Sequence, residues 1–213
     1  MGGRRALARR LAAVRSFDDP RVDLEQYPTP AEIAASIVHL ADLRGDIADA
    51  QVIDLGAGTG MLAIGFACRS PARVIGIERD PAAIAIARDN VTRVDPECGV
   101  ELIRGDVTTS PLRDGIGATV VTNPPFGAQR NNVHADRLFL SVASTIADVS
   151  YSLHNAGSRD FVSSFAADNG GNITDEVAVT FDLARQFSFH DEESTEIPVE
   201  LYRISWTDDR SDQ

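Results

Sequence analysis

Lysine is absent from the 213 residues of this chain, so all 20 basic residues are arginine. Aspartate and glutamate together number 32, which gives a formal net charge of −12 at pH 7. Surface carboxylates repel one another in dilute buffer, whereas molar salt screens them, because the Debye length falls to about 3 Å at 1 M. The composition therefore predicts a halophilic protein that works in concentrated salt.

Long apolar runs and cysteine pairs are also missing. No apolar run approaches the roughly 20 residues needed to cross a bilayer, and residues 1–16 lack the apolar core and cleavage site of a signal peptide. We therefore predict a cytoplasmic protein that does not enter a membrane. Cys68 and Cys98 lie far apart and form no CxxC pair, so neither a disulfide framework nor a metal site is expected.

Short β-rich runs alternate with helical runs from residue 51 onward, which predicts βαβ units and a parallel sheet. The expected strands are 51–55, 73–78, 100–104, 118–122, 149–153, 177–185 and 199–206. The expected helices are 31–43, 60–69, 81–94, 136–147 and 158–168. The last two strands have no helix between them, which predicts an antiparallel hairpin at one edge. The pattern is that of a class I methyltransferase: a Rossmann-like seven-stranded sheet with helices on both faces.

The domain organisation follows from the same pattern. We expect a helical N-terminal extension over residues 1–48, the α/β domain over 49–207 and a disordered acidic tail over 208–213. Five arginines fall within the first fifteen residues, which contain no acid. Leu7, Leu11 and Val14 recur there at helical spacing. This leader is interpreted either as a helix packed on the domain or as a segment that follows nucleic-acid phosphates.

A glycine-rich loop follows the first strand of the domain and precedes a helix. It runs from Asp54 through Gly56, Gly58 and Gly60, with the spacing G-x-G-x-G. The dinucleotide fingerprint has a different spacing, G-x-G-x-x-G. Glycines at these positions allow a tight turn and a close approach of the backbone to a ligand. The loop therefore predicts a cofactor site that is not a dinucleotide site.

Acidic residues follow the next two strands at the same edge of the predicted sheet. Glu78 ends the second strand, where a carboxylate can accept hydrogen bonds from ribose hydroxyls. Asp106, followed by Val107, comes after the third strand and can accept from an adenine amine. Ligands of open α/β sheets bind at the carboxyl ends of the strands. We therefore expect Glu78, Asp106 and Val107 to bind an adenosine-containing cofactor, S-adenosylmethionine.

The fourth strand ends in Asn123, Pro124, Pro125 and Phe126, the candidate catalytic residues. Two consecutive prolines stiffen the backbone. The Asn123 side-chain oxygen and the Pro124 carbonyl could accept both hydrogens of a planar amine and direct its lone pair at a methyl group, while Phe126 stacks on the base. Asn123 is placed in the cofactor site as well. The motif alone also fits a rigid loop with a core phenylalanine.

Several substrates share this chemistry. An adenine amine in RNA or DNA, a guanine amine and a protein glutamine amide are all planar amines, so the Asn-Pro-Pro corner suits each of them. A catalytically silent scaffold that binds the cofactor is a further alternative. An intact Asn123 and Phe126 argue against it.

The chain resembles the methyltransferase-like protein five family, the adenine-N6 methyltransferases of small-subunit ribosomal RNA, and its archaeal members. The resemblance depends on the LEQYPT segment (residues 24–29), the glycine loop, the NPPFG loop (123–127), the YSLH element (151–154) and the FH pair (189–190). It implies that the LEQYPT segment covers the cofactor, so Gln26, Tyr27 and Thr29 become cofactor-binding candidates. It also implies an RNA substrate and a heterodimer with a small zinc-binding methyltransferase activator protein.

Overall fold

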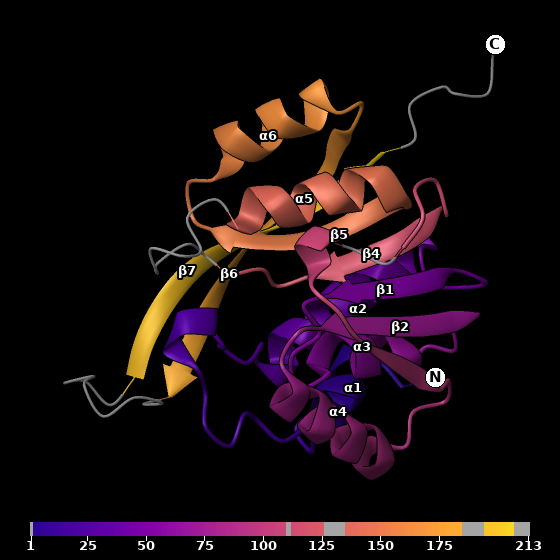
Figure 1. Ribbon diagram of the computed structural model, residues 1–213, viewed down its shortest axis with the longest axis vertical. Helices are drawn as coiled ribbons and strands as arrows, with labels where there is room; N and C mark the ends of the chain where they lie inside the picture. The colour runs from indigo at the N-terminus through magenta and orange to yellow at the C-terminus, as the bar shows by residue number, and fades with distance from the viewer. Residues whose placement is uncertain (1, 110–111, 126–134, 185–193, 207–213) are drawn as a thin grey trace.

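The computed structural model describes residues 2–109, 112–125, 135–184 and 194–206. One seven-stranded sheet has the strand order β3-β2-β1-β4-β5-β7-β6 (Figure 1). The strands are β1 (Gln51–Leu55), β2 (Arg73–Glu78), β3 (Val100–Arg104), β4 (Ala118–Thr122), β5 (Ala147–Asn155), β6 (Asn172–Ala184) and β7 (Ser194–Ser205). Strands β1 to β5 pair in parallel, whereas β7 runs antiparallel to both β5 and β6. The predicted fold class and its C-terminal hairpin are confirmed.

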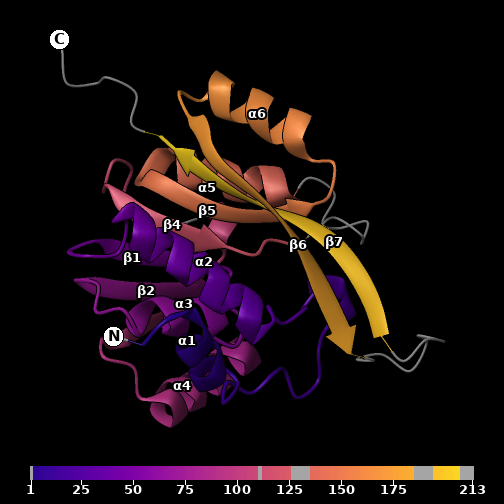
Figure 2. The same ribbon diagram turned by 180° about the vertical axis from the view of Figure 1, so that it is seen from behind.

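Helices cover both faces of the sheet. They are α1 (Arg4–Leu11), η1 (Val22–Leu24), α2 (Ala31–Arg44), α3 (Met61–Ala67), α4 (Pro81–Val94), η2 (Val107–Thr109), α5 (Ala135–Ile146) and α6 (Arg159–Asp168). Figure 2 shows α1 and α2 in front of the sheet, and α5 lies on the opposite face, as Figure 1 shows. Helix α6 packs against β7 on the α5 side. No helix among the described residues is long and apolar enough to span a membrane.

The leader helix α1 packs on the domain. Leu7, Ala8 and Leu11 are buried in the core between α2 and α3, and burial of a leucine side chain stabilises a fold by about 1.5–3 kcal/mol. Arg10 donates from Nη1 to both carboxylate oxygens of Glu97 at 2.7 Å. The packed-helix interpretation of the leader is therefore confirmed, and Arg5 and Arg9 remain exposed on the outer face.

Element boundaries match the predicted ones closely in the first half of the domain and less well at the C-terminal hairpin. Strands β1 to β4 and helix α4 have the predicted bounds. Helix α4 begins where Asp80 accepts a hydrogen bond from the Ala82 amide and Pro81 takes the first helical position. Strands β6 and β7 each begin five residues earlier than predicted. Their pairing in the hairpin extends both strands through mostly polar residues. Residue Arg185 and the predicted tail, 208–213, lie outside the described residues.

Candidate active site

The glycine loop is shaped by backbone conformations that favour glycine. Gly56, Gly58 and Gly60 all have positive φ, at 75°, 53° and 88°, where other residues are strained. A Cβ on Gly56 would lie 3.0 Å from the Phe139 ring, and one on Gly58 would lie 3.1 Å from the Phe17 ring. Side chains at Gly56 and Gly58 would therefore be strained and would crowd these two rings, and the loop lines a pocket at the carboxyl edge of the sheet.

Asp54 ends β1 beneath this loop and is almost fully buried. Its Oδ2 accepts a 2.9 Å hydrogen bond from the Ala63 amide at the start of α3. Its Oδ1 is buried and has no hydrogen-bond partner among the described residues. Burial raises the pKa of Asp54 to about 7, opposed by the Ala63 bond and reinforced by the negative charge of Glu78. The site thus holds a buried acid with one free acceptor.

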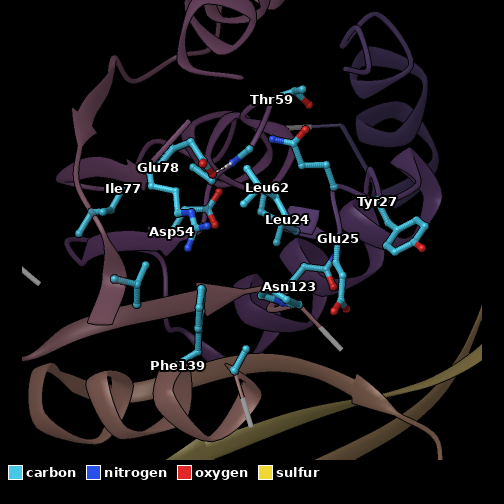
Figure 3. Close-up of a pocket in the computed structure, with 18 of the residues that line it drawn as sticks. Leu24, Glu25, Tyr27, Asp54, Thr59, Leu62, Ile77, Glu78, Asn123 and Phe139 are labelled. Atoms are coloured by element: carbon cyan, nitrogen blue, oxygen red, sulfur yellow. Dashed lines mark hydrogen bonds between the residues drawn. The ribbon is translucent and has the colours of Figure 1, made fainter. Parts of the chain in front are cut away.

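Glu78 connects the glycine loop to the end of β2. Its Oε2 accepts from the Gly58 amide at 2.9 Å, and its Oε1 accepts from the Asp80 amide at 2.8 Å. Each carboxylate oxygen can accept a second hydrogen bond, so the predicted contact with ribose hydroxyls stays possible. In Figure 3, Glu78 and Asp54 lie together on one side of the pocket, and Asn123 lies across from them beside Glu25.

Asp106 and Val107 close the same end of the pocket. Asp106 Oδ1 accepts hydrogen bonds from the Thr108 hydroxyl at 2.7 Å and from the Thr108 amide at 2.9 Å. These bonds, with the Arg79 guanidinium 3.8 Å from Oδ2, lower the pKa of Asp106 despite partial burial. Val107 is buried and presents an apolar wall. A carboxylate beside an apolar wall is suited to bind a purine ring and its amine.

Asn123 follows β4 directly and points its amide toward the pocket. Its Nδ2 donates a 3.1 Å hydrogen bond to the Thr29 hydroxyl, while its Oδ1 is buried and accepts no hydrogen bond from any described residue. A buried acceptor without a donor is costly and rare in folded proteins. Pro124 is buried and Pro125 lines the pocket. Phe126 lies outside the described residues, so its predicted stacking role stays a prediction.

The LEQYPT segment lines part of the pocket, and its predicted contact with the cofactor stays a prediction. Gln26, Tyr27 and Thr29 all line it, but the polar atoms of Gln26 are engaged by the protein. Gln26 Oε1 accepts from the Arg21 amide at 2.9 Å, and its Nε2 donates to Asp80 at 2.7 Å. Gln26 therefore ties the segment to the start of α4.

Sequence reasoning missed several residues that line the pocket. They include Phe17, Leu24, Glu25, Arg79, Ala135, Leu138 and Phe139. Glu25 is buried and has a φ of 50°, an unusual backbone conformation for a non-glycine residue. Its place inside the LEQYPT motif was the available signal. Phe139 belongs to α5, and nothing in a helical pattern tells which helix face reaches a pocket.

The YSLH element forms a buried network instead of a pocket wall. His154 is 1% exposed, and its Nε2 lies 2.7 Å from the Ser152 hydroxyl. Its Nδ1 lies 3.9 Å from Asp136 at the start of α5. The rings of Phe161 and Tyr202 pack edge-on against it. These contacts favour a structural role over contact with substrate.

Comparisons with known proteins identify the family. Residues 34–173 match the family model described as the methyltransferase small domain. The rRNA N(6)-adenosine-methyltransferase Mettl5 of Drosophila melanogaster is 33% identical over 94% of this chain and 95% of its own length. This chain is a METTL5-type member of the methyltransferase small domain family. The METTL5-type fold and enzyme class predicted above are confirmed, and such enzymes depend on S-adenosylmethionine.

Other matches agree with this assignment. An uncharacterized protein of Methanocaldococcus jannaschii is 38% identical over 91% of this METTL5-type chain and 90% of its own. A crystal structure of a putative RNA methyltransferase from Pyrococcus horikoshii superimposes with a TM-score of 0.85 at 36% identity, covering 96% of this chain and 98% of the other. The similarity therefore spans more than nine tenths of this chain.

Proposed function

We propose that this enzyme transfers a methyl group from S-adenosylmethionine to the N6 amine of an adenine in small-subunit ribosomal RNA. The observation that carries the proposal is the buried Oδ1 of Asn123 at the pocket end of β4, which has no hydrogen-bond partner among the described residues. Whole-length relatives named as rRNA adenosine-N6 methyltransferases support the choice of substrate. A primary amine is one of the hydrogen-bond donors that such an acceptor can bind.

Asn123 and Pro124 would bind the target amine through hydrogen bonds. Asn123 Oδ1 and the Pro124 carbonyl would each accept one N6 hydrogen, which holds the amine and directs its lone pair into the pocket. The developing positive charge strengthens both hydrogen bonds in the transition state, and only such a difference lowers the barrier. S-adenosylmethionine supplies an electrophilic methyl group on a sulfonium. The stiff Pro124–Pro125 backbone keeps the acceptors in place.

The described residues fit that cofactor. Gly56 and Gly58 line the pocket without side chains and allow close approach of the ligand, whereas a Cβ on Gly60 would meet Ile64 and Ala87 outside the pocket lining. The Oδ1 of Asp54, which has no hydrogen-bond partner among the described residues, would accept from an ammonium group. Glu78 would bind the ribose hydroxyls. Asp106 would accept from the adenine amine of the cofactor, with Val107 packed on its ring. Tyr27 and Gln26 would close the pocket from the LEQYPT segment.

A small zinc-binding activator protein is the proposed partner, as the family resemblance implies. Strand β3 forms one edge of the sheet and pairs only with β2 among the described strands, so its outer edge offers backbone groups for strand addition. Co-expression with such a partner should raise the soluble yield. A lone chain that is soluble and fully active would contradict the need for it. A cytoplasmic location stays a prediction.

Substrate identity can be tested directly. Isotope-labelled S-adenosylmethionine would be incubated separately with small ribosomal subunits, stripped rRNA, DNA and protein, and the labelled product would be digested and identified. We expect N6-methyladenosine in small-subunit rRNA. Label in DNA, guanine or glutamine would overturn the substrate assignment. Label in none of them, with the cofactor still bound, would favour the scaffold alternative.

A further inference from the structure

The leader continues beyond helix α1 and reaches the cofactor pocket. Helix α1 ends at Leu11, and Phe17, further along the same segment, lines the pocket. The Phe17 ring lies where a side chain on Gly58 would point, since a Cβ there would be 3.1 Å from the ring. Gly58 donates its amide hydrogen to Glu78, the predicted ribose-binding carboxylate. The ring therefore adjoins the part of the pocket that is assigned to the ribose.

The Phe17 ring is only partly buried by the protein. Its exposure is intermediate, whereas Phe66 and Phe181 are 0% exposed in the core. An aromatic ring that stays partly exposed at a pocket offers apolar surface that a ligand can cover, and covering such surface favours binding. Phe17 is therefore suited to contact a bound ligand.

A buried asparagine on α4 holds the leader close to Phe17. Asn90 is 0% exposed. Its Oδ1 accepts from the Arg15 amide at 2.8 Å, and its Nδ2 donates to the Arg15 carbonyl at 2.9 Å. Nδ2 also donates to the Thr59 carbonyl in the glycine loop at 2.9 Å. Just before Phe17, the leader is thus tied to the same loop that the Phe17 ring contacts.

These hydrogen bonds leave the Asn90 amide one favourable orientation. A backbone N–H can only donate and a backbone carbonyl can only accept. Turned over, the amide would place its NH₂ group against the Arg15 N–H and its oxygen against two carbonyls, which is costly at a buried position. Asn90 is therefore a fixed link between α4, the leader and the glycine loop.

We propose that the leader is part of the cofactor site: Phe17 contacts bound S-adenosylmethionine, and Asn90 is a positioning residue that holds Phe17 in place. The leader then does more than pack on the domain, because its end completes the wall of the pocket. This inference rests on the cofactor assignment within the proposed function. It depends on no property of the RNA or of the target amine.

Substitution of Phe17 tests the contact. Phe17→Ala should raise the dissociation constant of S-adenosylmethionine, measured by calorimetry, about 10-fold, which corresponds to about 1.4 kcal/mol. Phe161→Ala is the matched control, because Phe161 has the same intermediate exposure but lies on α6 and does not line the pocket. It should change the dissociation constant less than about 2-fold. An affinity that Phe17→Ala leaves unchanged would overturn the proposal.

Asn90→Ala tests the positioning role. In the otherwise native chain it should raise the dissociation constant about 5-fold or more, and in the Phe17→Ala background less than about 2-fold, a coupling that a double-mutant cycle measures. The second effect is small because the ring that Asn90 holds is already gone. Equal increases in both backgrounds would show that Asn90 acts on the glycine loop through Thr59, and would overturn its positioning role.

A measurement on the native chain needs no substitution at Asn90. The Arg15 amide is hydrogen-bonded to Asn90 Oδ1, so its hydrogen exchanges only when this bond opens. If opening withdraws Phe17 and weakens cofactor binding about 10-fold, saturating cofactor must slow the exchange by the same factor, because linkage is reciprocal. In ¹⁵N-labelled full-length protein we expect this slowing, and in Phe17→Ala a slowing of less than about 2-fold.

Equal slowing in both chains, or none in the native chain, would overturn the proposal. Neither measurement requires turnover, so the two proposals fail separately. A chain that shows both cofactor responses but methylates nothing would sink only the proposed function. A chain that methylates rRNA while its cofactor affinity does not depend on Phe17 would sink only this inference.

Discussion

At the scale of single residues, catalysis is assigned to Asn123 and cofactor binding to the glycine loop. Asn123→Ala removes the free acceptor and should lower methyl transfer about 10²–10³-fold, the usual loss for one preorganised polar group. The affinity for S-adenosylmethionine should stay within about 2-fold, because the cradle at Gly56 and Gly58 is untouched. Single-turnover rates and calorimetric titrations measure the two quantities.

A matched control for this substitution is Asn172→Ala, an exposed asparagine at the start of β6 that does not line the pocket. It should change neither the rate nor the affinity. If Asn123→Ala weakened cofactor binding as much as it slowed transfer, Asn123 would belong to the cofactor site and not to the catalytic one.

Asp54 should leave a signature in the pH dependence of stability. Its pKa is raised from 3.8 to about 7 by burial, so the folded protein keeps a proton that the unfolded chain releases. The free energy of unfolding therefore decreases as the pH rises from about 4 to about 7, by up to about 4 kcal/mol. Asp54→Asn removes this loss. Urea unfolding of both proteins should show that the free energy of unfolding of the variant increases, relative to that of the native chain, between pH 4 and pH 8.

The difference between the two urea curves isolates Asp54, because every other carboxylate is common to both proteins. A difference that does not change with pH would mean that Asp54 is ionised in the folded enzyme throughout this range. Carboxylates such as Asp106, whose pKa is lowered by Thr108, act with the opposite sign and lose their contribution at low pH.

At the scale of elements, a charge network joins the start of the domain to the hairpin. Arg203 on β7 donates from Nε to Asp46 Oδ2 at 2.8 Å and from Nη2 to Asp46 Oδ1 at 2.9 Å. The Tyr151 hydroxyl on β5 donates to the same carboxylate. These side chains of Arg203 and Asp46 are only 15% and 11% exposed. The hydrogen bond to Asp46 raises the pKa of Arg203, whereas burial first, and then Asp46, raises the pKa of Tyr151.

Arg203→Met should lower the free energy of unfolding by about 2–4 kcal/mol, because it leaves a poorly solvated Asp46 carboxylate without its cation. Arg73→Met is the control. Both side chains of its ion pair with Glu101 are about half exposed, so the cost should stay below about 1 kcal/mol. Denaturant unfolding of both variants at pH 7 measures the costs. Equal costs would show that the network is as weak as a surface pair.

The sequence predicted those elements whose boundaries depend on local signals. Asp80 and Pro81 mark the start of α4, and the glycine loop marks the end of β1. The hairpin was predicted too short, since residues 172–176 are polar apart from Ile173 and pair only because β7 lies beside them. The site was predicted where parallel strand ends converge. Phe17, Phe139 and the Thr29–Asn123 bond were missed, because they depend on how distant elements pack.

At the scale of the whole molecule, charge sets the conditions under which the fold is stable. The net charge is −12, and part of the arginine complement is taken up in ion pairs such as Arg10–Glu97 and Arg73–Glu101. The excess carboxylates repel one another in the folded state, which is more compact than the unfolded chain. Electrostatic attraction to RNA phosphates would also be weak in molar salt, so shape and stacking would carry recognition.

The thermal midpoint of unfolding should therefore rise when KCl is increased from 0.1 M to about 2 M, where the Debye length falls from about 10 Å to below about 3 Å. Calorimetry at pH 7 measures the rise, and the same titration at pH 4.5 is its control. Partial protonation of the carboxylates at pH 4.5 reduces the repulsion, so the rise in the thermal midpoint caused by salt should be smaller at this pH. A chain that is fully folded and active in dilute buffer, with no salt increment at pH 7, would refute the halophilic interpretation and leave the missing lysine without a physical reason.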